Sequence, residues 1–242
     1  MASYDGIFFD SGGTIFGAKP SGPKPSGGAP SPGQVGAQAP ERLAAALKWL
    51  GHAVSEAEVR QQLETERSQP RPAAYTEENR VRAVFEGLGL AAGDDEIVYA
   101  TGVYSGPRYR SWVFPGAAAA MGQLAEAGLA MGLIANTHVP GWVMDRHFRG
   151  IGLLHHLPVR VYSGDEGVAK PDPGIFHLAA ERAGLEGKRL AYMGDRVDKD
   201  VAGAAAAGWT SILFRSALDT SDGAADFEID AWDELPAILG AA

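Results

Sequence analysis

The second half of the sequence alternates between helical patterns and short apolar runs, and this alternation constrains the fold more than any other feature. Helices are predicted over 117–127, 140–150, 173–184 and 199–207. Strands are predicted over 129–136, 159–164, 189–195 and 210–215. Strands separated by helices form βαβ units, in which the strands run parallel. The strands are nearly continuous apolar runs, as expected where helices cover both faces of a sheet. The sequence therefore predicts an α/β fold with a parallel sheet.

The amino-terminal part of the chain lacks this alternation. Residues 4–10, with the sequence YDGIFFD, read as one further buried strand that ends in an acid. Residues 17–40 then hold Pro, Gly or Ser at 15 of 24 positions. Such a composition buries too little apolar surface to offset the entropy of ordering. We therefore expect a flexible linker over 17–40.

Residues 41–112 carry only helical patterns. Ser55 and Glu58 form a capping box, Thr76 is a predicted N-cap, and a fourth helix can begin at Asp94. Four short helices in succession predict a small helical subdomain. The expected organisation is an α/β core made of 1–16 and 113–242, the linker 17–40, and the helical subdomain 41–112.

Charge and composition narrow the expected partners. The chain has 242 residues, a formal net charge of −9 and no cysteine. A nucleic-acid partner is not expected, because such partners favour a basic stripe, whereas a phosphorylated small molecule needs only a local positive charge. The sequence has no basic leader and no apolar run of about 20 residues, so we expect neither secretion nor a membrane span. A cytoplasmic location is the expectation, and the oligomeric state stays open.

Polar side chains gather at the ends of the predicted strands or next to them. The set comprises Asp10, Asn136, Thr137, Lys170, Asp195 and Asp200. In parallel sheets, ligands bind beyond the carboxyl ends of the strands, so we expect these side chains to share one crevice.

This combination of side chains suits phosphoryl transfer. A carboxylate can attack phosphorus and form an aspartyl phosphate, and carboxylates can hold Mg²⁺, which prefers oxygen ligands. A lysine places positive charge beside the transferring oxygens. Hydroxyl and backbone N–H groups can bind the remaining phosphate oxygens.

Four motifs in this arrangement resemble the haloacid dehalogenase (HAD) superfamily, in its phosphatase-like branch with a helical cap of the first type. The motifs are DSGGT at 10–14, LIANT at 133–137, GVAKPDPGIF at 167–176 and MGDRVDKDVAGAAAAG at 193–208. The resemblance implies a Rossmann-like core of three layers around a parallel sheet, with an inserted helical cap. It also implies a Mg²⁺-dependent hydrolase that acts on a small phosphorylated metabolite.

The resemblance assigns roles to individual residues. Asp10 would be the nucleophile and would share Mg²⁺ with the backbone carbonyl of Gly12 and the carboxylate of Asp195. Asp200 would support the ion or Lys170, and Lys170 would contact both the nucleophile and the phosphate. The phosphate would also meet Gly13, Thr14, Asn136, Thr137 and His138.

Two positions depart from the family's pattern. Its phosphatases carry a second aspartate two residues after the nucleophile, which protonates the leaving oxygen and then activates water, and here that residue is Gly12. General acid–base catalysis is typically worth about 10²–10⁴-fold. We therefore expect weak or altered hydrolysis that suits acyl or enol phosphates. His138, which follows the second motif, is either a substitute acid or base or, as is more common for a lone histidine, a structural residue. The second departure is Ala135, where the family has Ser or Thr, and Thr137 is a candidate to supply the missing hydroxyl.

Several alternatives stay open. The chain is alternatively a catalytically reduced protein of this fold that binds a ligand or a partner. Another alternative uses Asp10 for carbon–halogen cleavage, carbon–phosphorus cleavage or group transfer. Halide-cleaving relatives dispense with Mg²⁺, whereas Asp195 and Asp200 are both kept here. Phosphonate-cleaving relatives place a lysine in the cap, for which the candidates are Lys19, Lys24 and Lys48.

Aromatic and basic residues mark the return from the helical subdomain to the core. They are Arg108, Tyr109, Arg110 and Trp112. They either line the cleft and contact an anionic or aromatic substrate, or pack at a hinge.

Overall fold

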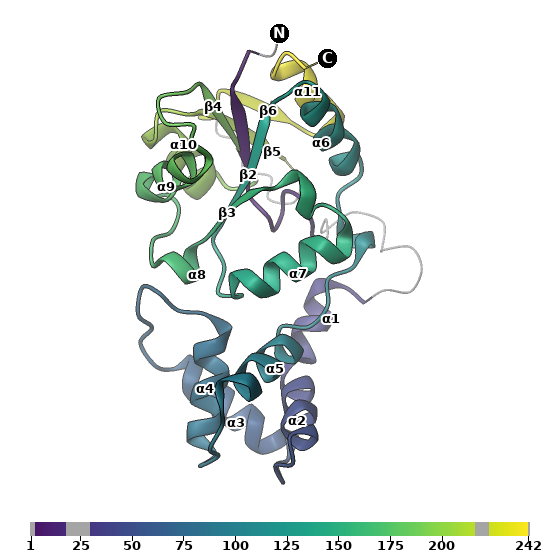
Figure 1. The fold of residues 1–242 in the computed structure, drawn as a ribbon, viewed down its shortest axis with the longest axis vertical. Helices are drawn as coiled ribbons and strands as arrows, with labels where there is room; N and C mark the ends of the chain where they lie inside the picture. The colour runs from purple at the N-terminus through teal and green to yellow at the C-terminus, as the bar shows by residue number, and fades with distance from the viewer. Residues whose placement is uncertain (1–2, 18–29, 216–222, 242) are drawn as a thin grey trace.

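The computed structural model describes residues 3–17, 30–215 and 223–241, which form an α/β core and a helical cap (Figure 1). The core contains one six-stranded sheet in which all neighbouring strands are parallel. Its strands are β1 (Gly6–Phe9), β2 (Ala130–Ala135), β3 (Val159–Tyr162), β4 (Leu190–Gly194), β5 (Thr210–Phe214) and β6 (Phe227–Ile229). The five strands expected from the sequence are confirmed, and β6 is a further strand.

The strand order β3-β2-β1-β4-β5-β6 places β1 in the middle of the sheet, between β2 and β4. At the carboxyl end of β1, Phe9 lies opposite Leu133 of β2 and Met193 of β4. The residues that follow these three strands therefore leave the sheet side by side, which is the arrangement that the sequence predicts for the polar cluster.

Helices cover both faces of the sheet (Figure 1). The principal core helices are α6 (Ala117–Glu126), α7 (Gly141–Ile151), α9 (Pro173–Ala183), α10 (Ala202–Ala206) and α11 (Leu235–Ile238). Ile7 and Phe9 point to one face and pack in a cluster with residues of α6, α7 and α11. Phe8 points to the other face and packs with residues of α9 and α10. This period of two along β1 makes the Rossmann-like three-layer core, and each such buried side chain contributes about 1.5–3 kcal/mol.

Two element boundaries in the core differ from the prediction. The strand expected over 159–164 ends at Tyr162, because the chain turns into the short helix α8 (Ser163–Glu166), where Gly164 N donates to Thr137 O. The helix expected from residue 199 begins earlier, as a π-helical turn over Val197–Val201. In that turn both Asp200 N and Val201 N donate to the carbonyl of Arg196. The turn places Asp200 in the site described below.

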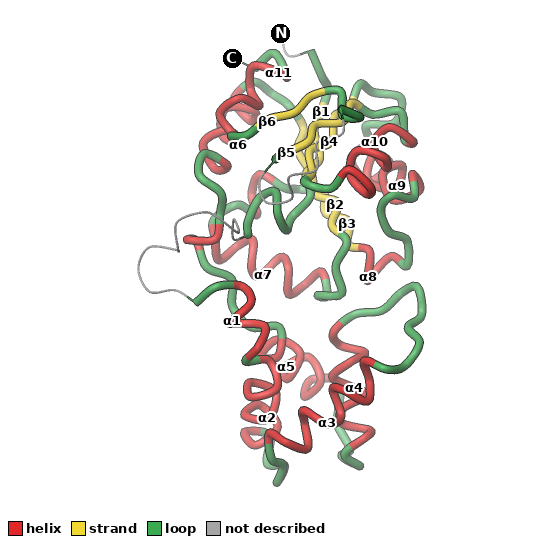
Figure 2. Tube along the Cα trace, turned by 180° about the vertical axis from the view of Figure 1, so that it is seen from behind, coloured by secondary structure: helices red, strands yellow, loops and turns green. Residues whose placement is uncertain are grey.

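The helical cap is a separate layer below the core (Figure 2). Its helices are α1 (Pro32–Ala37), α2 (Ala39–Trp49), α3 (Glu56–Arg67), α4 (Glu77–Gly87) and α5 (Asp94–Tyr104). The capping box of Ser55 and Glu58 and the N-cap at Thr76 are confirmed. The apolar faces of α2 to α5 meet in a cluster of their own around Leu43, Leu47, Leu63, Val84 and Phe85. None of the helices in the described ranges is long and apolar enough to cross a membrane.

The prediction of a linker over 17–40 is wrong for its second part. Residues 32–37 form α1, and α2 begins at Ala39. Ser31 accepts a hydrogen bond from Gln34 N while the Gln34 side chain accepts one from Ser31 N, and Val35 is buried. These local contacts, with Pro32 at the start of the helix, overcome the weak helix propensity of the composition. Residues 18–29, which include Lys19 and Lys24, lie outside the described residues.

The two chain segments that join cap and core run next to each other. Gly17 N donates to Trp112 O over 2.8 Å, and Phe16 forms a β-bridge with Val113. Short 3₁₀ turns complete the described chain, at Arg110–Trp112, Leu154–His156 and Trp232–Glu234. The paired connection brings the cap close to the loop that follows β1.

Candidate active site at the carboxyl ends of the strands

Three carboxylates meet beyond the carboxyl ends of the central strands. Asp10 follows β1, Asp195 follows β4, and Asp200 comes from the π-helical turn. One oxygen of each lies within 4.8 Å of the others, and all three residues are buried. Three hard oxygen donors at this separation fit a Mg²⁺ ion, which takes carboxylate ligands and keeps several waters. The sequence prediction that these residues converge is confirmed by the geometry.

Burial and mutual repulsion hold the acids at unusual pKa values. Desolvation by burial raises the pKa of Asp10 to about 6, although Lys170 opposes the shift. Desolvation, with repulsion from Asp10 and Asp200, raises the pKa of Asp195 to about 7. A cation between the carboxylates would relieve this repulsion, which is a second reason why the cluster fits a metal ion.

Lys170 links the carboxylates to the sheet. Its Nζ lies 2.6 Å from Asp10 Oδ1 and 2.8 Å from Asp200 Oδ1, and it also donates to the Tyr192 hydroxyl over 2.6 Å. Burial by itself lowers the pKa of Lys170, but the charges of Asp10 and Asp200 outweigh it and raise the pKa. Lys170 therefore stays positively charged beside Asp10.

Asn136 holds the backbone of Lys170. Its Nδ2 donates to Lys170 O over 2.8 Å, and its Oδ1 accepts from Lys170 N over 2.9 Å. The pair of bonds fixes the loop before α9 against the end of β2. In this structure Asn136 positions the lysine, a role that the sequence pattern does not indicate.

Two glycines allow the acids to approach the backbone. Gly13 has φ +89°, and a Cβ there would lie 2.1 Å from Asp195 Oδ2. A Cβ on Gly194 would lie 2.2 Å from Cγ of Asp200. Gly12 is different, because a Cβ there would meet no atom within 4 Å. The space of the missing carboxylate is therefore open.

The other residues expected to bind phosphate lie at different places. Thr14 is fully buried, and its hydroxyl has no hydrogen-bond partner within the described ranges. Thr137 Oγ1 accepts from Val139 N over 3.0 Å and so closes its own loop. His138 Nδ1 lies 3.2 Å from Tyr75 O, and His138 O accepts from Glu77 N over 2.6 Å. His138 thus belongs to the contact between core and cap, whereas Thr137 contacts residues of the core.

Two cavities adjoin at Gly12. The smaller, of about 180 Å³, contains the three acids, Lys170, Asn136 and Gly12, with Arg196 and Lys199 at its edge. The larger, of about 600 Å³, lies between cap and core, and its lining includes Gly12, Gly13, Glu77, Arg108 and Trp112. Of the four residues at the return to the core, Arg108 and Trp112 thus line the cleft. Desolvation lowers the pKa of the Arg108 guanidinium.

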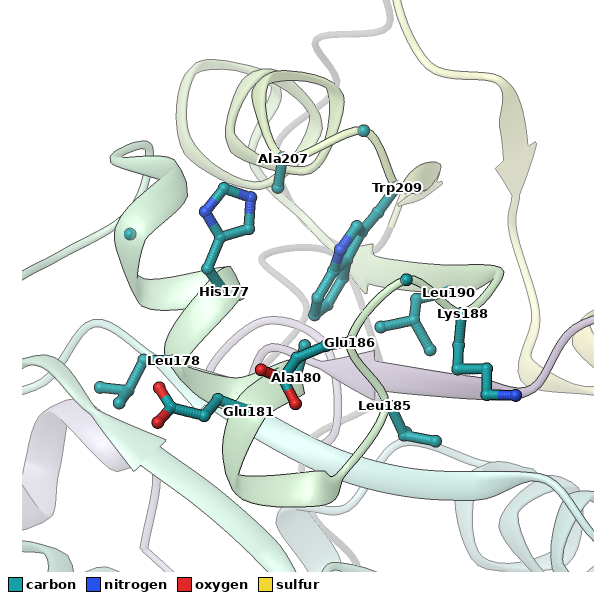
Figure 3. A pocket seen from close by; sticks show the side chains of 13 residues that line it. His177, Leu178, Ala180, Glu181, Leu185, Glu186, Lys188, Leu190, Ala207 and Trp209 are labelled. Atoms are coloured by element: carbon teal, nitrogen blue, oxygen red, sulfur yellow. The ribbon is translucent and has the colours of Figure 1, made fainter.

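A further hollow of about 570 Å³ lies elsewhere on the core (Figure 3). Its walls come from α9, the segment before β4 and the turn before β5, and include His177, Lys188 and Trp209. It is at the amino ends of β4 and β5, away from the acids. Lys48 lies on an exposed face of α2 and lines neither of the cavities that adjoin Gly12.

Tyr192 and Lys199 belong to the site without any signal that singles them out in the sequence. Tyr192 lies in β4, where an apolar run predicts simple packing, but its hydroxyl donates to Ile134 O over 2.8 Å and accepts from Lys170. The period of two along β4 would place it on the face opposite Met193, without indicating that partner. Lys199 lies beside Asp200 in the fourth motif, and only the turn geometry brings it to the cavity.

Comparison with known proteins agrees with this geometry. The model of the haloacid dehalogenase-like hydrolase family matches residues 4–208. The chain is 32% identical over 151 residues to a phosphoserine phosphatase of Thermus thermophilus, covering 62% of this chain and 60% of that protein. It is 36% identical over 120 residues to a glyceraldehyde 3-phosphate phosphatase of Methanopyrus kandleri, covering 47% and 50%. The chain thus spans between half and two thirds of the length of these relatives.

Solved structures show the same fold over nearly the whole chain. A 2-haloacid dehalogenase of Pseudomonas syringae pv. Tomato superposes with a TM-score of 0.66 at 19% identity, covering 98% of both chains. A HAD phosphatase of Thermococcus onnurineus superposes with a TM-score of 0.60 at 22% identity, also covering 98% of both. These likenesses concern the fold, and the family follows from the matching model: the chain belongs to the haloacid dehalogenase-like hydrolases.

Proposed function

We propose that the chain is a Mg²⁺-dependent phosphohydrolase of small phosphorylated metabolites, with Asp10 as the nucleophile. The observation that carries the proposal is the contact of 2.6 Å between Lys170 Nζ and Asp10 Oδ1 inside a cluster of three buried carboxylates. The lysine favours the anionic, nucleophilic form of Asp10, although burial works against it. The phosphatase names of the two relatives support a phosphomonoester substrate.

The residues of this chain would divide the reaction between them. The Asp10 carboxylate attacks phosphorus, the bond to the leaving oxygen breaks, and a phospho-Asp10 forms. Lys170 supplies positive charge to the transferring oxygens, while Asn136 and Tyr192 keep it in place. Water then attacks phosphorus and frees Asp10.

Asp10, Asp195 and the backbone of Gly12 would hold the Mg²⁺, and Asp200 would support it or Lys170. When bound, the ion would screen the repulsion between the carboxylates and an incoming phosphate. The cap of α1 to α5 would cover the site and exclude bulk water, since its cavity adjoins the acids at Gly12.

Gly12 removes the side chain that would move protons in this reaction. Without a substitute, hydrolysis would favour leaving groups that need no proton. A catalytically reduced protein that only binds its ligand is the second candidate. The glycine at position 12, where the family's phosphatases have an aspartate, is the observation that favours it. A chemistry at carbon that uses Asp10 is also compatible with a glycine there.

Phosphate release tests the proposal. Acetyl phosphate, p-nitrophenyl phosphate and sugar phosphates are compared with and without Mg²⁺ in the parent and in Asp10→Asn. The matched control is Asp198→Asn, because Asp198 is an exposed carboxylate of the π-helical turn that carries Asp200, and it pairs with Arg196.

We expect Mg²⁺-dependent release that is lost in Asp10→Asn and kept in Asp198→Asn. Release that survives in Asp10→Asn would remove Asp10 from the mechanism. No release from any substrate by the parent, or by a Gly12→Asp variant, would favour the binding protein.

A further inference from the structure

The geometry points to Glu77, the first residue of α4 in the cap, as the group that moves the protons in place of a side chain at Gly12. This inference rests on the proposed function, and it names a catalytic residue that the sequence motifs do not contain. It follows from the cavities that adjoin Gly12, from the contacts of Glu77 and from the space at Gly12.

Elimination leads to Glu77. Among the described residues, the carboxylates that line either cavity at Gly12 are Asp10, Asp195, Asp200 and Glu77. The first three form the cluster beside Lys170, where one is the nucleophile and the others would face the cation. His138, the substitute that the sequence suggests, lines neither cavity. Glu77 is therefore the carboxylate left for proton transfer.

The contacts of Glu77 place it against the core. Its backbone N–H donates to His138 O over 2.6 Å, two residues beyond Asn136. Its Oε2 accepts from the Ser105 hydroxyl over 2.5 Å. Oε1 has no hydrogen bond to any residue of the described chain, and Glu77 forms no ion pair there. The side chain is thus held at one oxygen and available at the other.

Two arginine side chains share the larger cavity with Glu77, and their positive charges suit a polar substrate. Arg42 and Arg108 line the same cavity and interact electrostatically with Glu77. Arg42 lies in α2, and its guanidinium donates to the carbonyls of Val35, Val103 and Tyr104. These bonds connect α2 with both α1 and α5. Among the described residues, Arg108 donates to the carbonyls of Pro107 and Ser105, at 3.3 and 3.4 Å. Within the described chain, neither arginine forms a hydrogen bond or an ion pair with the carboxylate of Glu77.

The missing side chain at Gly12 opens the route between Asp10 and Glu77. A Cβ at Gly12 would meet no atom within 4 Å, and Gly12 borders both cavities. A substrate whose phosphate lies at Asp10 can therefore extend its leaving oxygen past Gly12 into the cavity that Glu77 lines.

The proton balance is complete with one carboxyl group. As Asp10 attacks phosphorus, the bond from phosphorus to the leaving oxygen breaks, and the carboxyl group of Glu77 gives that oxygen a proton. Water then attacks the phosphorus of phospho-Asp10, the Glu77 carboxylate takes the proton of the water, and the bond from Asp10 to phosphorus breaks. The proton taken from the water replaces the one given to the leaving oxygen.

The test compares Glu77→Gln with Glu78→Gln. Glu78 is the next residue of α4 and is half-buried like Glu77, but it pairs with Arg82 and lines neither cavity. Glycerol 2-phosphate has an alkoxide leaving group that needs a proton, whereas acetyl phosphate does not. Phosphoenzyme and released phosphate are measured for both substrates, with and without an added Gly12→Asp substitution.

With acetyl phosphate, we expect Glu77→Gln to form phosphoenzyme in a stoichiometric burst and then turn over about 100-fold more slowly than the parent. With glycerol 2-phosphate, no phosphoenzyme should accumulate, because its formation also needs the proton. Gly12→Asp should restore turnover to Glu77→Gln, and Glu78→Gln should keep the parental rate.

Parental turnover numbers in Glu77→Gln, or a rise in KM alone, would overturn the inference and leave the proposed function intact. A loss that Gly12→Asp does not restore, with no burst from acetyl phosphate, would also overturn it by showing a structural role. A parent that hydrolyses neither substrate would instead refute the proposed function, and the inference with it.

Discussion

Gly12 and Gly13 are neighbours beside Asp10, but their surroundings are opposite. A methyl group on Gly13 would collide with Asp195, and the φ of +89° there disfavours any side chain. A methyl group on Gly12 would meet no atom within 4 Å. We expect Gly13→Ala to displace Asp195 and weaken Mg²⁺ binding by about 10- to 100-fold, the usual cost of disturbing the surroundings of a metal ligand.

Isothermal titration with Mg²⁺ measures this effect, and Gly12→Ala is the matched control, which should change the affinity far less. Equal losses in the two variants would contradict the placement of Asp195 among the metal ligands. A folded Gly13→Ala protein, checked by circular dichroism, is needed for the comparison.

The sequence predicts the site residues that lie at strand ends and misses those that act through tertiary contacts. Asp10 and Asp195 follow apolar strands, so the rule for parallel sheets is enough to bring them together. Glu77 at the first turn of a helix has an ordinary explanation, since acids are common there because of the helix dipole. Only the docking of the cap on His138 gives Glu77 a place at the cavity.

At the scale of elements, a buried network joins two helices of the cap. Arg80 of α4 donates from Nε to Glu66 Oε2 of α3 over 2.7 Å, and Glu66 also accepts a hydrogen bond from the Tyr75 hydroxyl. The side chains of Arg80 and Glu66 are only 10% and 8% exposed. We expect Arg80→Leu to lower the free energy of unfolding by about 3 kcal/mol, because it removes the nearer ion-pair partner of a buried carboxylate and leaves Arg71, at 3.5 Å, as the other.

Chemical denaturation measures this loss. Arg60→Leu is the control, since Arg60 pairs with Glu56 on the exposed face of α3 and should contribute less than about 1 kcal/mol. Similar losses of unfolding free energy in the two variants would show that the buried pair of Arg80 and Glu66 stabilises the protein no more than an exposed pair does.

Helix α7 carries a buried histidine with a clear pH signature. Burial, with the nearby charge of Arg108, lowers the pKa of His147 from 6.5 to about 4. Its Nε2 lies 2.8 Å from Gly106 O, and Nδ1 finds no partner among the described residues. The unfolded chain binds a proton near pH 6.5 and the folded chain only near pH 4. The contribution of His147 to stability is therefore complete above pH 6.5 and falls by about 3 kcal/mol as the pH drops to 4.

Unfolding free energies at a series of pH values test this expectation in the parent and in His147→Gln, which keeps a donor for Gly106 O. The difference between the two proteins should shrink as the pH falls from 6.5 to 4. If the unfolding free energies of the two proteins differed by the same amount at every pH, His147 would not titrate as a buried neutral group.

Element boundaries in the cap show where composition misleads. The segment 17–40 has a composition typical of disorder, yet α1 forms within it because Ser31 and Gln34 cap each other and Val35 packs into the fold. The average composition of a segment gives no information on a capping pair such as Ser31 and Gln34. The core helices and strands were predictable because their periodicity extends over whole elements.

At the scale of the whole molecule, the parallel sheet brings together residues that are distant in the chain. Asp10 and Lys170 are 160 positions apart and form an ion pair, because β1 lies between β2 and β4. The paired connections at Gly17 and Trp112 bring the cap over the same edge of the sheet. The α/β class and the parallel strands follow from the sequence, whereas the seating of the cap depends on contacts that no periodicity encodes.

The central claim is that Asp10 carries the phosphoryl group, and a covalent intermediate tests it most directly. The protein is incubated with acetyl phosphate and Mg²⁺, quenched in acid, digested, and analysed by mass spectrometry. We predict a phosphoryl group on the peptide that contains Asp10, absent from Asp10→Asn and absent when Mg²⁺ is chelated. Phosphate release without any phosphorylated Asp10 peptide, or a phosphoryl group on another residue, would contradict the account.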